Sequence, residues 1–297
     1  MIRELSILIP TYNTPCVPLV EALYRQAQGI AGLSFEIIVA DDGSTDKAIT
    51  ADNDKGIAPL PHCQHIIRPT NCGRAAIRNF LAQSASYRWL LFMDCDVSID
   101  DGFLAHYLPC DTSPVTYGGV RIGGSSSIWK DNLRYRYEKK NEQRHTTAQR
   151  SLRPHQSFRT TNFMVEKSVV LAHPFEIEIN TYGYEDVLFG KELCNSGIPI
   201  HHLDNPVVYT HYEDNALFTA KTEEALETLA RHQTSLMGYS RLLQLKGRIH
   251  DAHLAWLARG FFHVTQKALR GNLCGHHPQL WVYNLYRIGY LVSHTNS

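Results

Sequence analysis

Two aspartates stand one residue apart directly after an apolar run: RWLLFM (88–93) leads into Asp94, Cys95 and Asp96. Hard divalent cations such as Mg²⁺ and Mn²⁺ prefer carboxylate oxygens and keep coordination positions open for phosphate. One intervening residue lets both carboxylates reach the same side of a bent strand end. A polar turn after a buried strand would use the same residues. The triplet alone therefore leaves a metal site and a turn both open.

Polar groups also follow other apolar runs in the first half of the chain. The runs are LSILI (5–9), FEIIVA (35–40) and the weaker QHIIR (64–68). Helical patterns separate them, most clearly over 75–84. Alternation of short apolar strands with helices predicts a parallel sheet covered by helices, in which ligands bind outside the carboxyl ends of the strands. We therefore expect the polar groups that follow these strands to gather along one rim.

The remainder of the chain is less regular up to about residue 214. Strands are expected at 114–122 and 157–165, with a helix over 183–197 followed by the short strands PIHHL and PVVYTH. A helical segment at 129–153 carries eight Lys or Arg against three acids, a net charge of +5. Three amphipathic helices are predicted after it, at 219–237, 240–270 and 278–293. We expect a catalytic domain over 1–214 and a helical extension over 215–297.

Composition excludes several classes of protein. Of the 297 residues, 43% are apolar, and Lys+Arg and Asp+Glu both number 29, so nothing attracts the whole chain to nucleic acid. The seven Cys are odd in number and form no Cys-x-x-Cys pair, which favours reduced cytosolic thiols over a disulfide framework or a structural zinc site. No apolar run reaches the roughly 18 residues of a transmembrane helix, and the N-terminal stretch is too short for a signal peptide.

Four separated motifs coincide in order and spacing: PTYN (10–13), DDGSTD (41–46), NCGRAAIRN (71–79) and the Asp-x-Asp. Together they resemble the nucleotide-binding half of glycosyltransferase family 2, whose members adopt the GT-A fold. The resemblance covers about residues 4–120, continues through TYGYEDVLFGKEL and VYTHYE, and does not obviously cover 215–297. It implies an α/β fold: a GT-A type Rossmann-like, mostly parallel central sheet flanked by helices, with a C-terminal helical extension.

The resemblance also implies roles for individual residues. Pro10 and Thr11 would touch the uracil of a UDP-sugar, and Asp42 would accept a hydrogen bond from the uracil N3–H. Asp94 would approach the ribose, while Asp96 would ligate Mn²⁺ or Mg²⁺. The full nucleotide-sugar set is Pro10, Thr11, Asn13, Asp42, Asn71, Arg74, Arg78, Asp94 and Cys95. The metal set is Asp94, Asp96 and His211, the last because many metal-dependent relatives have a His after the last core strand.

The segment TYGYED (181–186) is similar to a Trp-Gly-x-Glu-Asp pattern in relatives that transfer galactose or N-acetylhexosamines, with Tyr182 in place of Trp. The resemblance implies that Asp186 is the general base for the acceptor hydroxyl and that Glu185 holds sugar or acceptor hydroxyls. A carboxylate within about 3 Å can accept such a proton. Two acids in the first turn of a helix are also favoured by the helix dipole alone. The resemblance also implies inversion at the anomeric carbon, because a related retaining family has Glu-Asn at this place.

The resemblance therefore implies an inverting, metal-dependent glycosyltransferase that moves a hexose or N-acetylhexosamine from a UDP-sugar to a glycan hydroxyl, in polysaccharide or glycolipid biosynthesis. A dehydrogenase should show Gly-x-Gly-x-x-Gly after the first strand, where this chain has Pro-Thr-Tyr-Asn. A sugar-nucleotide nucleotidyltransferase would usually carry a Gly-rich loop there, also missing. A non-catalytic UDP- or glycan-binding homologue could lose the acids at the strand ends, which this chain retains.

The C-terminal segment 278–293 allows two interpretations. Trp281, Leu285, Ile288 and Val292 share one helical face, with tyrosines around it. The helix could pack on the catalytic domain, or it could contact a membrane surface, where aromatic residues are favoured. Many relatives extend glycans on lipid carriers, so a lipid-linked glycan acceptor is one expected partner. We expect a cytoplasmic protein and leave open a peripheral contact at the inner face of the membrane.

Overall fold

The computed structural model describes residues 1–179 and 181–294, so the last three residues of the expected C-terminal extension lie outside the described residues. The described chain divides into two compact units. The first holds residues 1–123, 143–179 and 185–210, and the second holds 124–142, 181–184 and 211–294. The second unit thus takes in three stretches of the expected catalytic domain, 124–142, 181–184 and 211–214. The functional boundary at 214 stays a prediction.

The first unit is built on a mostly parallel sheet, as predicted. Within the described residues it has seven strands in the order β3-β2-β1-β4-β7-β5-β8. They are β1 (Glu4–Thr11), β2 (Ser34–Asp41), β3 (Cys63–Ile67), β4 (Trp89–Met93), β5 (Val115–Tyr117), β7 (Asn162–Glu166) and β8 (Ile200–His202). Strands β3, β2, β1 and β4 are parallel, and β7 runs antiparallel to β4 and β5. The carboxyl ends of β1, β2, β3 and β4 therefore meet at one edge.

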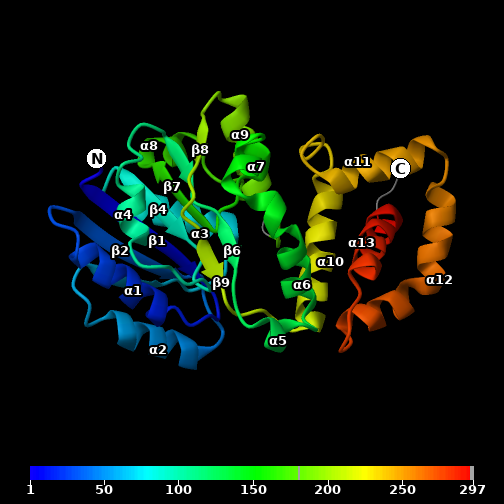
Figure 1. The fold of residues 1–297 in the computed structure, drawn as a ribbon, viewed down its shortest axis with the longest axis horizontal. Helices are drawn as coiled ribbons and strands as arrows, with labels where there is room; N and C mark the ends of the chain where they lie inside the picture. Colours follow the sequence, from blue (N-terminus) through cyan, green and yellow to red (C-terminus); the bar gives the residue numbers. More distant parts are fainter. Residues whose placement is uncertain (180, 295–297) are drawn as a thin grey trace. The chain divides into compact units, whose positions relative to one another are not determined.

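Helices cover both faces of this sheet (Figure 1). Leu8, Leu90 and Phe92 point into a core shared with α3 (Arg74–Ser84), α8 (Lys167–Ala172) and α9 (Glu185–Asn195). Alternate strand residues such as Ile7 and Val39 are equally buried, because α1 (Val17–Gln28) and α2 (Lys47–Ile57) lie on the opposite face. Burial on both faces explains why β1, β2 and β4 read as continuous apolar runs, whereas the edge strand β3 is only partly buried and has the weaker pattern. A short helix, α4 (Phe103–Tyr107), contacts α1.

The single strand expected at 114–122 is wrong, because Gly118 and Gly119 divide it into β5 and β6 (Val120–Ile122). Gly119 has a φ of +94°, and a Cβ on Gly118 would lie 2.4 Å from the Asn205 carbonyl oxygen. The chain therefore leaves the sheet at this pair, and β6 pairs in parallel with β9 (Val207–Tyr209). The strand expected at 157–165 is also shorter, since the 3₁₀ turn η2 (His155–Ser157) precedes β7.

The basic segment 129–153 is broken rather than one helix. It contains α5 (Ser126–Trp129), α6 (Leu133–Asn141), the 3₁₀ turn η1 (Glu142–His145) and α7 (Thr147–Ser151). Two polar side chains cap the N-termini of new helices. Asn132 accepts from the Tyr135 N–H at the start of α6, and Thr146 accepts from the Gln149 N–H at the start of α7. Such caps favour a new helix start over continuation of the previous one.

The second unit contains α10 (Asn215–Arg231), α11 (Arg241–Asp251), α12 (Ala255–Cys274) and α13 (Leu280–His294). The helix predicted over 240–270 is therefore two helices. They are separated at 252–254, where His253 takes a left-handed conformation with φ 57° that an α-helix cannot include. No helix in the described part of the chain is long and apolar enough to span a bilayer.

Helix α13 packs between α10 and α12 (Figure 1). Its tyrosines are buried and hydrogen-bonded: Tyr286 donates to Glu223 at 2.6 Å, and Tyr290 donates to Glu227 at 2.9 Å. Tyr283 lies 3.1 Å from the Thr222 hydroxyl. These contacts favour packing over membrane contact for most of this helix, but the partners lie on α10 of the extension rather than on the expected catalytic domain.

Candidate active site

The ends of β1 and β2 are tied together by one side chain. Asn13 accepts a hydrogen bond from the Asp46 N–H at 2.9 Å, and its own N–H donates to the Ser44 hydroxyl at 2.8 Å. Thr11 is buried, and its hydroxyl donates to the Thr14 carbonyl. Pro10 precedes these residues in β1. The PTYN and DDGSTD motifs therefore form one connected wall at the carboxyl edge of the sheet.

Asp42 holds the next loop in place. One carboxylate oxygen accepts from the N–H groups of Cys72 and Gly73 at 3.1 and 2.9 Å, and the other accepts from Arg68 at 3.0 Å. Gly43 allows the approach, since its φ is +72° and a Cβ there would lie 2.5 Å from the Thr70 backbone. A carboxylate offers about four acceptor positions, so Asp42 retains capacity for one more donor.

Loop 71–74 opens α3. The Asn71 side chain accepts from the Gly73 N–H at 3.0 Å, and the exposed Arg74 reaches Glu185 at 3.5 Å. The contact of Asp42 with uracil, and those of Asn71 and Arg74 with the nucleotide, stay predictions.

Arg78 joins the Asp-x-Asp to the Glu-Asp pair. Its guanidinium donates to Asp94 at 2.9 Å and to Glu185 at 3.3 Å, and its side chain is 2% exposed. The guanidinium also lies over the Phe175 ring, 5.9 Å from the ring centroid. A buried cation needs such partners, because an unpaired charge inside a protein costs several kcal/mol. Two motifs that lie about 90 residues apart in the sequence thus share one buried cation, and Arg78 positions both carboxylates.

The backbone turns sharply just before α9, which begins with Glu185 and Asp186. Gly183 and Tyr184 both adopt left-handed conformations, with φ of 93° and 70°. A bulky residue at positive φ is unusual, and such strain concentrates at functional sites. Glu185 and Asp186 follow in the first turn of α9, where the helix dipole favours negative charge.

Asp186 is partly buried, and this environment changes its acidity. Desolvation, with the neighbouring Glu185 charge as a second cause, raises the pKa of Asp186 to about 6. The nearby Arg159 guanidinium opposes this rise. At neutral pH the carboxylate is ionised and can accept a proton, which is the state that a general base requires.

Cys95 lies between the two aspartates and is hydrogen-bonded to Thr11. Desolvation, followed by the Asp96 charge, raises the pKa of the Cys95 thiol to about 12. It therefore contributes a neutral group to the site rather than a thiolate.

Asp94 and Asp96 offer a donor set that fits a hard cation. Both are carboxylates at the end of β4, and Asp96 is exposed, so phosphate and water could complete the coordination of Mn²⁺ or Mg²⁺. Within residues 1–179 and 181–294, no three His, Cys, Asp or Glu side chains are close enough to form a metal site by themselves. His211 is exposed and belongs to the second unit, so its role as a further ligand stays a prediction.

Two residues that act on the carboxylates of this site, Arg68 and Arg159, were not predicted from the sequence. Arg68, which binds Asp42, directly follows β3, and the expectation of polar groups at strand ends could have found it. Arg159, whose charge acts on Asp186, precedes β7 without any motif. Its side chain also contacts His145 at 3.3 Å. No local pattern predicts its approach to the Glu-Asp pair.

Polar loops at the carboxyl edge of the sheet, two carboxylates after β4 and an acidic pair opening α9 thus form one polar site on an α/β fold. The model of the family "Glycosyl transferase family 2" matches residues 6–172, more than half of the chain, and the chain belongs to this family. A curated relative, an uncharacterized glycosyltransferase of Haemophilus influenzae, is 34% identical over 100 residues. That match covers 31% of this chain and 36% of the relative.

Solved structures of GT-A glycosyltransferases share the fold. S. aureus TarS 1–349 is 19% identical with a TM-score of 0.51, over 98% of this chain and 90% of that one. The mannosyltransferase PcManGT from Pyrobaculum calidifontis, in complex with GDP-Man and Mn²⁺, is 14% identical with a TM-score of 0.55, over 97% and 85% of the two chains. The predicted GT-A fold is confirmed.

Proposed function

We propose that this chain is an inverting glycosyltransferase that moves a hexose or N-acetylhexosamine from a UDP-sugar to a hydroxyl of a glycan or lipid-linked glycan. The observation that carries the proposal is the link from Asp94 through Arg78 to the Glu185-Asp186 pair, with the pKa of Asp186 raised to about 6. This arrangement supports a carboxylate base held beside the donor diphosphate.

The proposed reaction is a displacement at the anomeric carbon. The acceptor oxygen forms a bond to that carbon, the bond from the carbon to the diphosphate oxygen breaks, and UDP leaves with the electron pair. Asp186 takes the acceptor hydroxyl proton as the new bond forms. A pKa near 6 keeps this base ionised at neutral pH while leaving it basic enough to accept the proton.

The remaining groups hold the substrates in line, which supplies much of the rate in such reactions. Asp42 would offer its remaining acceptor position to a base N–H, and Glu185, which Arg78 and Arg74 contact, would accept hydrogen bonds from sugar or acceptor hydroxyls. A Mn²⁺ or Mg²⁺ ion held by Asp94 and Asp96, with His211 as the proposed third ligand, would neutralise charge developing on the leaving UDP.

The similar solved structures support a nucleotide-sugar donor, but they differ in its nucleobase. TarS 1–349 is described in complex with UDP-GlcNAc, whereas PcManGT is described with GDP-Man. The test incubates the full chain with UDP-glucose, UDP-galactose, UDP-GlcNAc, UDP-GalNAc and GDP-mannose, each with Mn²⁺, Mg²⁺ or EDTA. Released nucleoside diphosphate is measured with and without glycan acceptors.

We expect UDP release from one UDP-sugar, stimulated by acceptor and abolished by EDTA. Release of GDP alone would overturn the uracil assignment. Full turnover in excess EDTA would overturn the metal assignment. Binding of UDP without any turnover across a broad acceptor panel would favour a non-catalytic homologue.

A further inference from the structure

Helix α12 exposes large apolar side chains that a soluble surface helix normally covers. Trp256 is 69% exposed and Val264 is 82% exposed, and Phe261 and Leu257 are also open to solvent. Leu257, Phe261 and Val264 follow one another at helical spacing, so they form one stripe along the helix. The opposite side of α12 packs inward through Phe262 and Leu273. We call the stripe with Trp256 the α12 face.

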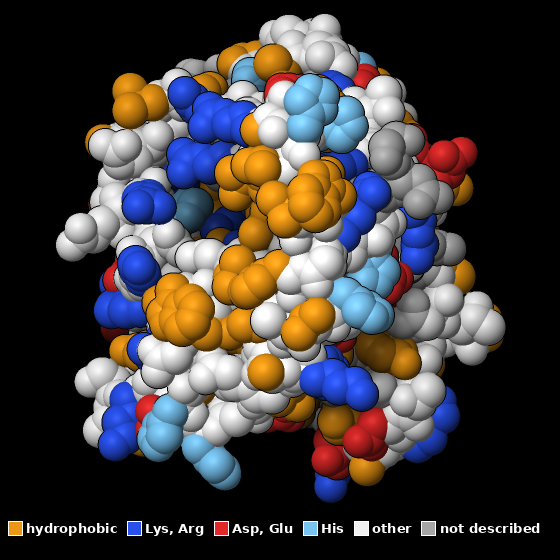
Figure 2. All heavy atoms as spheres, turned by 90° about the vertical axis from the view of Figure 1, so that its right-hand side faces the viewer, with side chains coloured by type: hydrophobic (Ala, Val, Ile, Leu, Met, Phe, Trp, Pro, Cys, Tyr) orange, Lys and Arg blue, Asp and Glu red, His pale blue; other side chains and the backbone are white. Residues whose placement is uncertain are grey.

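Other parts of the second unit also expose large apolar side chains. Leu245 on α11 and Leu254 in the connection to α12 are exposed as well, as is Trp281 at the start of α13. Figure 2 shows hydrophobic side chains gathered in the middle of this side of the second unit, with Lys and Arg on both flanks. Contiguous apolar exposure with a polar border marks an interaction surface rather than scattered surface residues.

The segment that contains α11 and α12 carries a net positive charge. Residues 241–274 contain six Lys or Arg and one acid, Asp251. On α11, Arg241 and Arg248 share a helical side with Leu245, and on α12 the exposed Lys267 lies one turn beyond Val264. Among the described residues, no acidic side chain forms an ion pair with these three cations.

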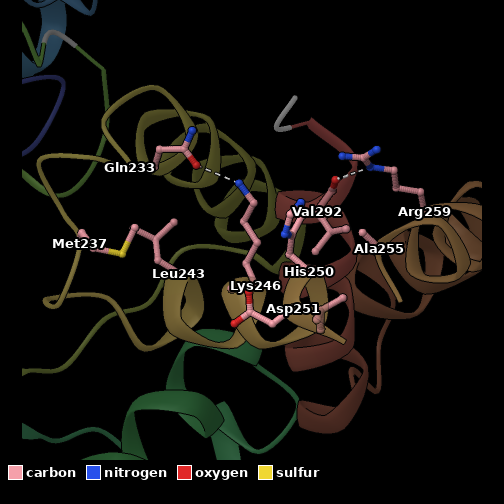
Figure 3. Close-up of a pocket in the computed structure, with 11 residues that line it drawn as sticks. Gln233, Met237, Leu243, Lys246, His250, Asp251, Ala255, Arg259 and Val292 are labelled. Atoms are coloured by element: carbon pink, nitrogen blue, oxygen red, sulfur yellow. Dashed lines mark hydrogen bonds between the residues drawn. The ribbon is translucent and has the colours of Figure 1, made fainter. Parts of the chain in front are cut away.

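Not every cation of the segment is available at the surface. Lys246 and Arg259 line a partly open pocket of about 210 Å³ in the second unit, together with Met237, Leu243 and Val292 (Figure 3). Lys246 donates to Gln233 at 2.8 Å and Arg259 to the Val292 carbonyl at 3.0 Å. Arg270 pairs with Glu223. The cations that remain for an outside partner are Arg241, Arg248 and Lys267.

We propose that the α12 face docks on the surface of a bilayer containing anionic phospholipid. Aromatic and aliphatic side chains beside unpaired cations are the pattern of an interfacial helix, which enters the headgroup region with its apolar side and attracts lipid phosphate with its basic flank. A second copy of the chain fits less well. A symmetric dimer through this face would bring the same cations of both copies together without acids to neutralise them.

The test measures sedimentation of the full chain with vesicles of phosphatidylcholine, alone or mixed with phosphatidylglycerol. The apolar variant carries Trp256→Ser and Phe261→Ser. Its matched control carries Leu171→Ser and Ile177→Ser, two exposed apolar residues of the first unit. The charge variant carries Arg241→Gln, Arg248→Gln and Lys267→Gln. Circular dichroism and melting curves check that each variant is folded, and light scattering measures the oligomeric state.

We expect the wild type and the control to bind mixed vesicles, and added salt to weaken the binding. The apolar variant should bind about tenfold or more weakly, and the charge variant should lose about fivefold in affinity for each cation removed. No binding of the wild type to mixed vesicles at low salt would overturn the proposal. An equal loss of vesicle binding in the control variant would also overturn it. A third contrary result would be a wild-type protein that forms dimers but binds no vesicles, with the apolar variant monomeric.

Discussion

The rim of the sheet and the α12 face differ in what their residues contact. At the rim, Asp42 and Glu185 are buried charges held by several donors. On the α12 face, Trp256 and Val264 are apolar groups left in water. Burying charge and exposing apolar surface are both unfavourable for an isolated fold. The two arrangements motivate two different proposals, a polar nucleotide-sugar at the rim and a bilayer with anionic phospholipid at the α12 face.

The largest expected effect is at the proposed base. Asp186→Asn keeps the shape of the side chain but removes its ability to accept a proton, so kcat should fall by roughly 10²–10⁴ while UDP binding is retained. Initial rates and UDP titration calorimetry measure the two quantities. Glu192→Gln, an exposed acid on the same helix, is the matched control and should leave kcat unchanged.

The pH dependence sharpens the same assignment. Because the ionised form is the base, kcat/KM of the wild type should rise with pH and level off above the Asp186 pKa of about 6. The residual activity of Asp186→Asn should lack this acidic limb. An unchanged limb in the variant would assign the titration to another group.

Arg78 tests whether the rim depends on buried charge pairing. Arg78→Met leaves the buried Glu185 without its closest cation, and removing one partner of such a pair costs about 3–5 kcal/mol of stability. Urea unfolding followed by circular dichroism measures the loss. Arg88→Met removes the exposed pair with Glu166 and should cost at most about 1 kcal/mol. Equal losses would mean that burial does not govern these pairs.

Asp42 separates nucleotide binding from catalysis. Asp42→Ala removes an acceptor for a base N–H and releases the 71–73 loop, so UDP affinity should fall by about 1.5–3 kcal/mol with a smaller change in kcat. Asp46→Ala, at the same rim, removes only the N-cap of α2 and should lower stability by about 1 kcal/mol. An identical UDP affinity in Asp42→Ala and the wild type would remove Asp42 from the nucleotide site.

The smallest expected effects are changes in stability from two glycine substitutions in the second unit. A Cβ on Gly289 would lie 2.4 Å from the buried Phe262 ring, so Gly289→Ala should destabilise the protein because overpacking of about 1–3 kcal/mol exceeds the gain in helix propensity. Gly260, on the exposed side of α12, has open space around it, and Gly260→Ala should stabilise by about 0.5–1 kcal/mol. Thermal melts measure both. The same sign for both variants would contradict the assignment of inner and outer sides.

The inner strands of the sheet were predictable from the sequence because they are buried on both faces. Continuous apolar runs at 5–9, 35–40 and 88–93 indicate such strands directly, and polar residues at their ends identify the rim. The break between β5 and β6 was not predictable, because Gly118 and Gly119 lie within an otherwise regular strand pattern. The structure explains the two glycines, since a Cβ there would collide with Asn205 or Arg150.

The helical half was less predictable, because apolar spacing does not reveal which side is covered. Leu257 and Phe261 keep a helical period, which is typical of a core-facing stripe, yet the structure exposes both. The links of Arg78 to Asp94 and Glu185 join residues far apart in sequence. A single sequence contains no local signal for such contacts.

The loop held by Asp42 has one more consequence, which concerns chemical labelling. Cys72 donates its N–H to Asp42 and is exposed, while Cys194 is exposed near the end of α9 in the same unit. Cys16 and Cys110 are buried. A nucleotide bound against the 71–73 loop would shield the Cys72 thiol from an alkylating reagent and leave Cys194 open. If the donor binds as proposed, Cys72 would report donor-site occupancy and Cys194 would serve as the internal reference, both readable by mass spectrometry without an engineered label.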